Sequence, residues 1–180
     1  MGYLEKKLQA IISAQGWKFK TGNLYDLTSN TSWAEGTPLV QYSTGTGSTL
    51  GATATSPYLT FDNDTATKST STIVDRLWGQ MKWTKPRRLS KVTSYVYQNN
   101  NSSGKKTRKL YGIKADNSTV LLGTKENAIG SGDQTLNETW TIADTDAIYY
   151  GLALDIYEVG YPGRVIYLYE LQVTEWYEKG

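Results

Sequence analysis

Residues 148–156 constrain the fold more than any other segment, because apolar side chains alternate there with other residues over the whole stretch. A period of two is that of a β-strand, in which successive side chains point to opposite faces of a sheet. The odd-numbered face would carry smaller or polar groups such as Gly151 and Asp155. We therefore predict a strand whose even-numbered face lies in the core, formed by Ile148, Tyr150, Leu152, Leu154 and Ile156.

From residue 57 onward, the chain consists of similar short segments separated by turn-forming residues. Enrichment in Val, Thr, Tyr and Trp favours strands, and a proline such as Pro86 is expected to end one. The segments predicted as strands are 77–83, 89–97, 109–115, 120–122, 139–142, 148–156 and 165–173. Many short strands without a helical pattern predict an all-β protein, a β-sandwich of the jelly-roll kind.

The first 56 residues follow a different pattern. Apolar positions in 3–15 have helical spacing, and Gly16 is a plausible stop, so we predict a short N-terminal α-helix. Residues 17–56 are rich in Thr, Ser, Asn and Gly and are predicted to form an extended arm. We therefore expect an attachment or oligomerisation segment at 1–56 and a β-sandwich at 57–180. The attachment residues would be Leu4, Leu8, Ile11, Ile12 and Trp17.

Composition removes most catalytic options. The 180 residues include no His and no Cys, so the commonest general base, the thiol nucleophile and the usual zinc ligands are missing. The net charge of +2 gives no electrostatic support for nucleic-acid binding, and no apolar run is long enough to cross a membrane. A convergent pair of carboxylates is the remaining catalytic option. We expect a protein that is not an enzyme.

An ordered series of motifs resembles the discoidin family, also called the F5/8 type C or galactose-binding-like domain. An Asp-x-Asp-x-x-Thr turn at residues 62–67 comes first, and Tyr169-Glu170-Leu171-Gln172-Val173 comes last. Between them lie a proline turn at Lys85-Pro86, a polar turn at 115–118 and a core strand at 149–154. The resemblance covers roughly residues 57–176. It implies a galactose-binding-like β-sandwich with ligand-binding loops at one end.

The sequence departs from the family pattern at three points. Asn63 replaces the usual Gly of the turn, and Ser69 stands where the family usually has a Trp. The sugar-binding members often use a His, which this chain lacks. Asn also tolerates a left-handed backbone, so the first departure preserves the turn. The other two weaken the inference to galactose binding more than the inference to the fold.

The resemblance implies a structural calcium ion that ties the first and last strands together. Its ligands here would be Asp62, Asp64, Thr67 and Glu170, completed by backbone carbonyls. Carboxylate, hydroxyl and carbonyl oxygens are the ligands that calcium prefers. The alternative is an Asp-rich turn capped by its own side chains, which needs no metal.

Two loops carry the mixture of aromatic, amide and basic groups that a glycan site needs. The candidate glycan-binding residues are Asn99, Asn100, Asn101 and Arg108 from one loop, with Lys105 nearby, and Tyr157, Tyr161 and Arg164 from the other. The family places its binding loops at one end of the sandwich, so these loops are expected to converge. The alternative is that both are ordinary solvated loops.

Two function classes follow. The first is a virion structural protein of a bacteriophage, a capsid decoration, head-fibre or tail component, which displays the discoidin-like module and binds host surface glycans. Its partners would be sibling subunits and other virion proteins, and its location the virion. The composition of the chain, rich in Ser, Thr, Asn, Gly and Tyr, resembles that of phage surface proteins. The second is a free carbohydrate-binding module or lectin, secreted or at the cell surface. Assembly state separates the two, because a virion component forms a fixed oligomer.

Overall fold

The structure is a computed structural model that describes residues 2–25, 35–43, 49–68, 76–98, 105–127, 133–144, 146–159 and 165–180. Its elements in chain order are α1 (Tyr3–Ala14), β1 (Trp17–Thr21), β2 (Gly36–Ser43), β3 (Ala52–Thr53), the 3-10 helix η1 (Pro57–Thr60), β4 (Arg76–Gln98), β5 (Lys105–Ile113), β6 (Thr119–Glu126), β7 (Gln134–Thr141), β8 (Tyr149–Val159) and β9 (Ile166–Lys179). No helix among the described residues is long and apolar enough to cross a membrane.

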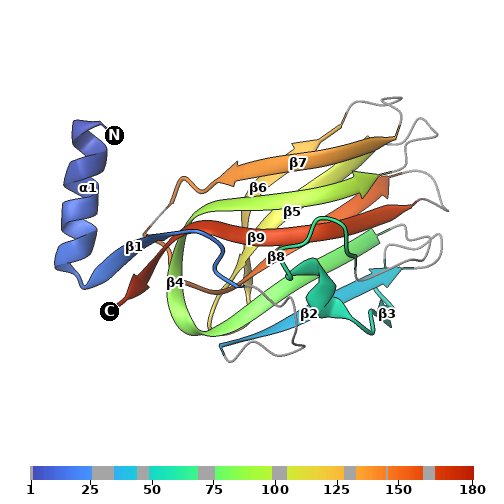
Figure 1. Cartoon of the computed structure of the whole chain (residues 1–180), viewed down its shortest axis with the longest axis horizontal. Coiled ribbons are helices and arrows are strands. Elements are labelled where there is room, and N and C mark those ends of the chain that lie inside the picture. The colour runs from blue at the N-terminus through green and yellow to red at the C-terminus, as the bar shows by residue number, and fades with distance from the viewer. Residues whose placement is uncertain are drawn as a thin grey trace.

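The strands form two layers that share one long strand, β4. The first half of β4 pairs with β2 and β8, and β5 and β6 continue this layer beyond β8. The second half of β4 pairs with β9 and β7, and β1 pairs with β9. All of these pairings are antiparallel. Figure 1 shows β4 bending sharply so that its two halves lie in different layers. The predicted all-β sandwich is therefore confirmed.

The bend in β4 replaces the strand break that we predicted at Lys85-Pro86. β4 continues through Pro86, and its pairing with β8 shifts register between Lys82 and Arg87. Proline removes a hydrogen-bond donor from the ladder, so it is tolerated where pairing is interrupted. The two predicted strands, 77–83 and 89–97, are thus one strand that changes sheets.

The core fills the space between the layers. Leu77, Met81, Val92, Leu154 and Leu168 are almost fully buried and belong to one apolar cluster. The even-numbered face of β8 contributes Leu152, Leu154 and Ile156 as predicted, each with 0% exposure. Burial of side chains of this size is the main favourable term in folding.

The prediction was wrong for Ile148, whose side chain is 41% exposed, and Tyr150 is only half-buried. Tyr149 occupies the core there instead, with 1% exposure. The pairing of β8 with β4 is irregular at this end of the strand, so strict alternation does not extend through Tyr149. Gly112 makes room for the Tyr149 ring, because a Cβ atom at Gly112 would lie 2.3 Å from it. The Trp83 indole nitrogen also donates to the Tyr149 carbonyl at 3.0 Å.

Residues 17–56 are not a separate arm in the parts that the structure describes. β1 pairs with β9 from Trp17 to Thr21, and β2 pairs with β4 from Gly36 to Ser43. Trp17, Tyr25 and Val40 are buried. Scattered apolar residues in a polar segment are enough to add edge strands when a sheet offers unpaired backbone groups. The sandwich therefore begins at β1, and the predicted boundary at 56/57 lies within it.

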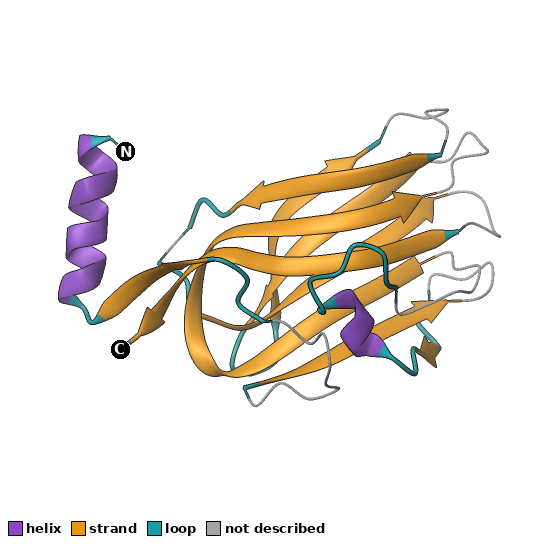
Figure 2. Ribbon diagram, viewed as in Figure 1, coloured by secondary structure: helices purple, strands orange, loops and turns teal. Residues whose placement is uncertain are grey.

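The predicted N-terminal helix is present as α1, and it stands apart from the sandwich (Figures 1 and 2). Gly16, with φ of +79°, ends it, and Trp17 begins β1 directly afterwards. Trp17 is buried against Tyr177, with the Arg88 guanidinium 4.6 Å above its ring. Arg88 also donates to Gln15 at 3.2 Å. The base of α1 is thus fixed, while Leu4 and Ile11 remain 78% and 53% exposed.

Candidate functional site

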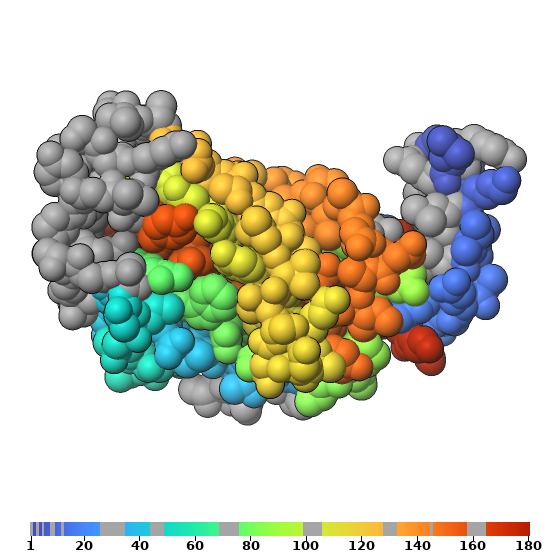
Figure 3. All heavy atoms as spheres, turned by 180° about the vertical axis from the view of Figure 1, so that it is seen from behind, coloured from blue at the N-terminus to red at the C-terminus, as the bar shows by residue number. Residues whose placement is uncertain are grey.

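A charged aromatic platform, the strongest candidate binding surface, lies on the outer face of the layer β2-β4-β8-β5-β6. Neighbouring strands place its residues opposite one another: Arg76 pairs with Tyr157, and both Trp78 and Lys109 pair with Asp155. This layer faces the viewer in Figure 3. The platform consists of Arg76, Trp78, Lys109, Tyr111, Asp155 and Tyr157.

Its aromatic part spans three strands. The Trp78 and Tyr111 rings lie 5.6 Å apart between centroids, tilted by 36°. Ala153, which pairs with Tyr111 and is fully buried, is small enough to let the two rings approach each other above β8. Both rings and that of Tyr157 are half-buried, so part of each ring surface is open to solvent. Aromatic rings of this kind offer a flat apolar surface with a polar edge.

Its charged part is ordered by a buried acid. Asp155 accepts two hydrogen bonds from Arg76, from Nε at 2.8 Å and from Nη2 at 2.7 Å. The Asp155 side chain is 4% exposed and that of Arg76 is 30% exposed, so the pair is accessible from the Arg76 side. Hydrogen bonding to Asp155 raises the pKa of Arg76 further above its already high range. A bidentate pair of this type fixes the orientation of the guanidinium.

Lys109 adds a cation between two tyrosines. Its Nζ lies 5.5 Å from the centroid of the Tyr157 ring. A hydrogen bond with the Tyr157 side chain and the nearby phenol of Tyr111 raise the pKa of Lys109. Lys109 is therefore charged throughout the physiological range. Beside it, the Trp78 indole nitrogen donates to Gln80 at 2.9 Å, which holds that ring in place.

The predicted glycan residues are only partly brought together. Tyr157 lies in the platform, whereas Asn99, Asn100, Asn101, Tyr161 and Arg164 lie outside the described residues, as does the side chain of Lys105. Arg108 is 1% exposed. It donates to Glu138 at 2.7 and 3.0 Å, to Gln98 at 3.2 Å and to Asn127 at 2.6 Å.

Arg108 is therefore part of the interior and does not reach a ligand surface in this structure. It alternates with Lys109 along β5, so the platform-facing base is Lys109. The sequence pattern did not reveal that Arg108 points inward, because the register of β5 was not fixed by its own pattern. Trp78 and Tyr111 were also missed, since outward-facing aromatics on different strands have no common spacing in the sequence.

The Asp-rich turn at 62–67 follows η1 and forms as predicted. Asn63 takes a left-handed backbone with φ of 58°. Asp62 is 4% exposed and accepts from the Asp64 amide at 3.1 Å and from the Thr67 hydroxyl at 2.7 Å. The Thr67 oxygen also lies 3.3 Å from the Leu59 carbonyl and 3.1 Å from the Asp64 carbonyl. Four hard oxygens thus converge on one side of the turn.

The side chain of Asp64 does not join them. It is exposed and accepts from the Ala66 amide at 2.8 Å, which is a capping role. Glu170 is 6% exposed on β9, and the Thr60 hydroxyl donates to Leu168 of the same strand at 3.4 Å. Burial and the nearby Glu170 carboxylate raise the pKa of Tyr25. The centroids of the Tyr25 and Phe61 rings lie 5.7 Å apart. Tyr25 is therefore close both to Phe61, which precedes the turn, and to Glu170 on β9.

The oxygen chemistry of this turn fits a hard cation held chiefly by Asp62, Thr67 and the Leu59 and Asp64 carbonyls. The part of the chain that the structure describes contains no group of three acidic, histidine or cysteine side chains that could hold a metal ion. Asp62, Asp64 and Glu170 therefore do not form an all-carboxylate site, and backbone carbonyls would have to supply part of any coordination.

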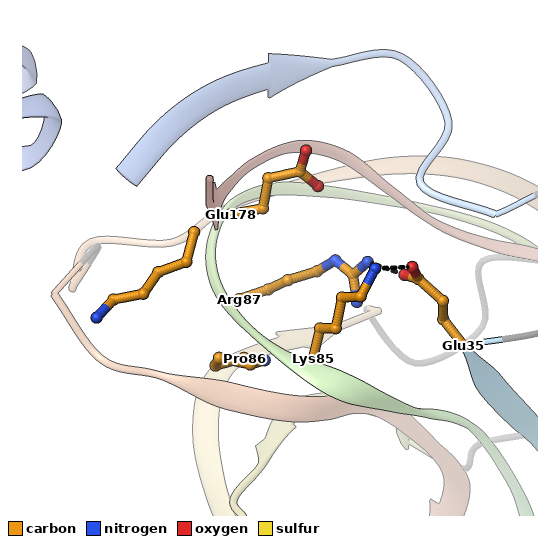
Figure 4. Close-up of a pocket in the computed structure, with 6 residues that line it drawn as sticks. Glu35, Lys85, Pro86, Arg87 and Glu178 are labelled. Atoms are coloured by element: carbon orange, nitrogen blue, oxygen red, sulfur yellow. Dashed lines mark hydrogen bonds and ion pairs between the residues drawn. The ribbon is translucent and has the colours of Figure 1, made fainter. Parts of the chain in front are cut away.

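A hollow of about 250 Å³ lies beside the bend of β4, remote from the platform (Figure 4). Figure 4 shows Lys85 and Arg87 both pointing toward Glu35, and Arg87 Nη2 lies 2.6 Å from the Glu35 carboxylate. These ion pairs connect the segment before β2 to the bend. The lining residues are Glu35, Lys85, Pro86, Arg87, Glu178 and Lys179.

No family model matches the sequence, and no curated protein matches it. Among solved structures, the C-terminal domain of a chitobiase from Bacteroides fragilis aligns with 79% of this chain and 94% of its own, at 11% identity and a TM-score of 0.49. The family 32 CBM of NanJ from C. perfringens, in complex with galactose, aligns with 81% of this chain and 95% of its own, at 14% identity and 0.47.

A family 89 glycoside hydrolase from Clostridium perfringens also aligns, at 16% identity and a TM-score of 0.46. The alignment covers 79% of this chain, which spans 14% of the length of that enzyme. With every one of these TM-scores under 0.5, the likenesses assign neither a ligand nor an activity to this chain.

Proposed function

We propose that this chain is a non-enzymatic glycan-binding module and that the charged aromatic platform is its binding surface. The observation that carries the proposal is the combination, on one exposed face, of the tilted Trp78–Tyr111 pair with the Arg76–Asp155 pair and Lys109. A sugar has apolar C–H faces and a rim of hydroxyl groups. Rings can cover the former, and charged side chains can hydrogen-bond to the latter.

The roles of the individual residues follow from their geometry. Trp78 and Tyr111 would stack against the sugar ring. The Arg76 side chain is 30% exposed and would contact the sugar at its rim, whereas Asp155 orients it from below. Lys109 would donate to a hydroxyl at the Tyr157 side. Because Asp155 already accepts two bonds from Arg76, it acts as a positioning residue and not as a general base.

Affinity measurements on immobilised galactose- and glucose-containing oligosaccharides test the proposal. Trp78→Ala should weaken binding about tenfold or more, which corresponds to roughly 1.4 kcal/mol. Phe19→Ala, which removes an exposed aromatic ring from β1 in the opposite layer, serves as the control and should bind as the unmodified protein does. Equal affinities for Trp78→Ala and the unmodified chain would place the binding surface elsewhere.

We also propose that a calcium ion stabilises the Asp-rich turn. Asp62, Thr67 and the carbonyls of Leu59 and Asp64 would hold it, with Glu170 as the nearest buried carboxylate on β9. The ion would supply fixed positive charge that joins the turn to the last strand, and it has no part in sugar chemistry.

The helix α1 supports a second role, attachment of the module to a larger assembly, for which we propose a virion shell as the sequence predicted. Leu4 is 78% exposed and Ile11 is 53% exposed on a helix that projects from the sandwich (Figure 1). Apolar side chains left in water on a projecting element are typical of an interface. Trp17 is not available for this role, because it is 2% exposed within the module.

A further inference from the structure

A row of charged and aromatic side chains crosses the outer face of the second layer, opposite the platform. The Lys68 ammonium lies 3.5 Å from the centroid of the Tyr167 ring on β9. The Tyr167 ring stacks against that of Tyr97 on β4, with 5.6 Å between centroids and 23° between planes. The Tyr97 hydroxyl donates to Asp133 at 3.1 Å. The order across the strands is thus cation, ring, ring, anion.

Two more tyrosines extend this row along the strands. The Tyr95 and Tyr169 rings lie 5.5 Å apart, and those of Tyr167 and Tyr169 lie 6.0 Å apart. All four tyrosines are half-buried, so each retains open ring surface. We call these four tyrosines, with Lys68 and Asp133, the tyrosine row. Tyrosine is enriched in protein interfaces because it offers a large contact area and a polar tip at little entropic cost.

The charge order makes the row complementary to itself. In a two-fold dimer, each patch meets an identical patch turned around the axis. Suppose that the two-fold axis lies in the plane of the interface, parallel to the strands, and passes between Tyr97 and Tyr167. Rotation about this axis exchanges the two ends of the row, so the cationic end of one copy meets the anionic end of the other. Lys68 then faces Asp133 of the second copy at both ends, with the four rings of each row packed between. A row with the same charge at both ends would instead repel its copy.

We propose that the tyrosine row is the interface through which two copies of this chain associate. The occupant is a second copy because the face carries opposite charges at its two ends and uncharged rings between them. This surface differs from the platform, which lies on the other layer, and from α1. Dimerisation through it leaves both platforms facing outward, so the pair would present two glycan-binding surfaces on opposite sides.

Charge reversal tests this geometry in the full chain. Lys68→Glu places acids at both ends of the row, and Asp133→Lys places cations at both ends. Each variant should raise the dimer dissociation constant about tenfold or more, because like charges then meet at both ends of the interface. Sedimentation velocity over a concentration series measures the change. Circular dichroism and melting should match the unmodified chain, since both positions lie at the surface.

Mixing the two variants gives the decisive result. In a mixed dimer, the acid introduced by Lys68→Glu in one chain meets the base introduced by Asp133→Lys in the other. The unchanged Lys68 and Asp133 meet at the opposite end, so both ends become attractive again. We expect the mixture, labelled with a donor and an acceptor dye, to associate with near-original affinity, and the double variant Lys68→Glu/Asp133→Lys to self-associate. Added salt should weaken all of these complexes.

Several results would overturn the proposal. The first is an unmodified chain that stays monomeric at millimolar concentration. The second is self-association of the single variants equal to that of the unmodified chain, which would place the contact on α1 or elsewhere. The third is a Tyr97→Ala variant that loses affinity for oligosaccharides while its mass distribution stays unchanged, which would make the row a glycan surface.

Discussion

At the scale of single residues, burial decides which apolar side chains hold the fold. Leu152 has 0% exposure in the core, whereas Leu121 is 52% exposed on β6. Leu152→Ala should lower the free energy of unfolding by about 2–5 kcal/mol, because it leaves a cavity. Leu121→Ala is the matched control and should stay within about 0.5 kcal/mol of the original value. Chemical denaturation measures both, and similar values for the two would mean that β8 is not in the core.

Glu35 gives a residue-scale prediction that depends on pH. Hydrogen bonds from Lys85 and then Arg87 lower the pKa of Glu35. An acid with a lowered folded pKa contributes stability above its unfolded pKa, and this contribution is lost as the pH falls through the folded value. Glu35→Gln should therefore lower stability by about 1 kcal/mol at pH 7.

The same substitution should have little effect once the pH is below the lowered pKa that Glu35 has in the folded protein, because both the folded and the unfolded state of the original protein then bind the proton. Melting curves between acid and neutral pH measure the difference between the two chains. A constant difference across that range would contradict a role for the Glu35 charge.

At the scale of elements, the Asp-rich turn is predicted to respond to calcium. Calcium should raise the melting temperature and EDTA should lower it, because an ion bound only by the folded state stabilises it. Asp62→Ala should abolish the difference. Asp64→Asn is a sharper control, since the Asp64 side chain only caps Ala66, so this variant should retain the calcium response. If melting of the unmodified chain is indifferent to both reagents, the turn is capped by its own side chains alone.

Removing α1 alone and removing α1 together with β1 and β2 should affect folding differently. Deleting residues 1–15 removes α1, which projects from the sandwich, and should leave a folded module that binds glycans but no longer forms assemblies larger than a dimer. Deleting residues 1–50 also removes β1, β2 and the buried Trp17, Tyr25 and Val40. The longer deletion should give an unfolded or aggregated chain, because it uncovers edges and core.

Light scattering and circular dichroism on the two truncated chains distinguish these outcomes. A folded, soluble product of the longer deletion would instead support the prediction from composition that residues 1–56 are independent of the sandwich. Assemblies of unchanged size after the shorter deletion would rule out attachment through α1.

At the scale of the whole molecule, β4 joins the two layers. Its first half pairs with β2 and β8 and its second half with β9 and β7. Neither layer can therefore lose its central strand without disturbing the other. We expect a single cooperative unfolding transition, with tryptophan fluorescence and far-ultraviolet circular dichroism changing together. Separate transitions for the two probes would indicate that the layers unfold independently.

Local patterns in the sequence were enough to predict the class of the fold and much of its local structure. The alternation in 148–156 predicted β8, and helical spacing with Gly16 predicted α1, because such periods are properties of the local backbone. The Asp-rich turn also formed as predicted, since Asp and Asn side chains bond to their own backbone.

Which residues meet on a surface depends on how strands distant in the chain pair with one another. Arg108 and Lys109 are adjacent in sequence, yet one lies in the interior with Glu138 and the other lies on the platform. Their faces depend on the register of β5 against β8, which is set by non-local pairing. Non-local pairing also brings Trp78 next to Tyr111, and it allows β4 to continue past Pro86. Such contacts join residues far apart in the chain, so no local pattern encodes them, and packing between strands selects them.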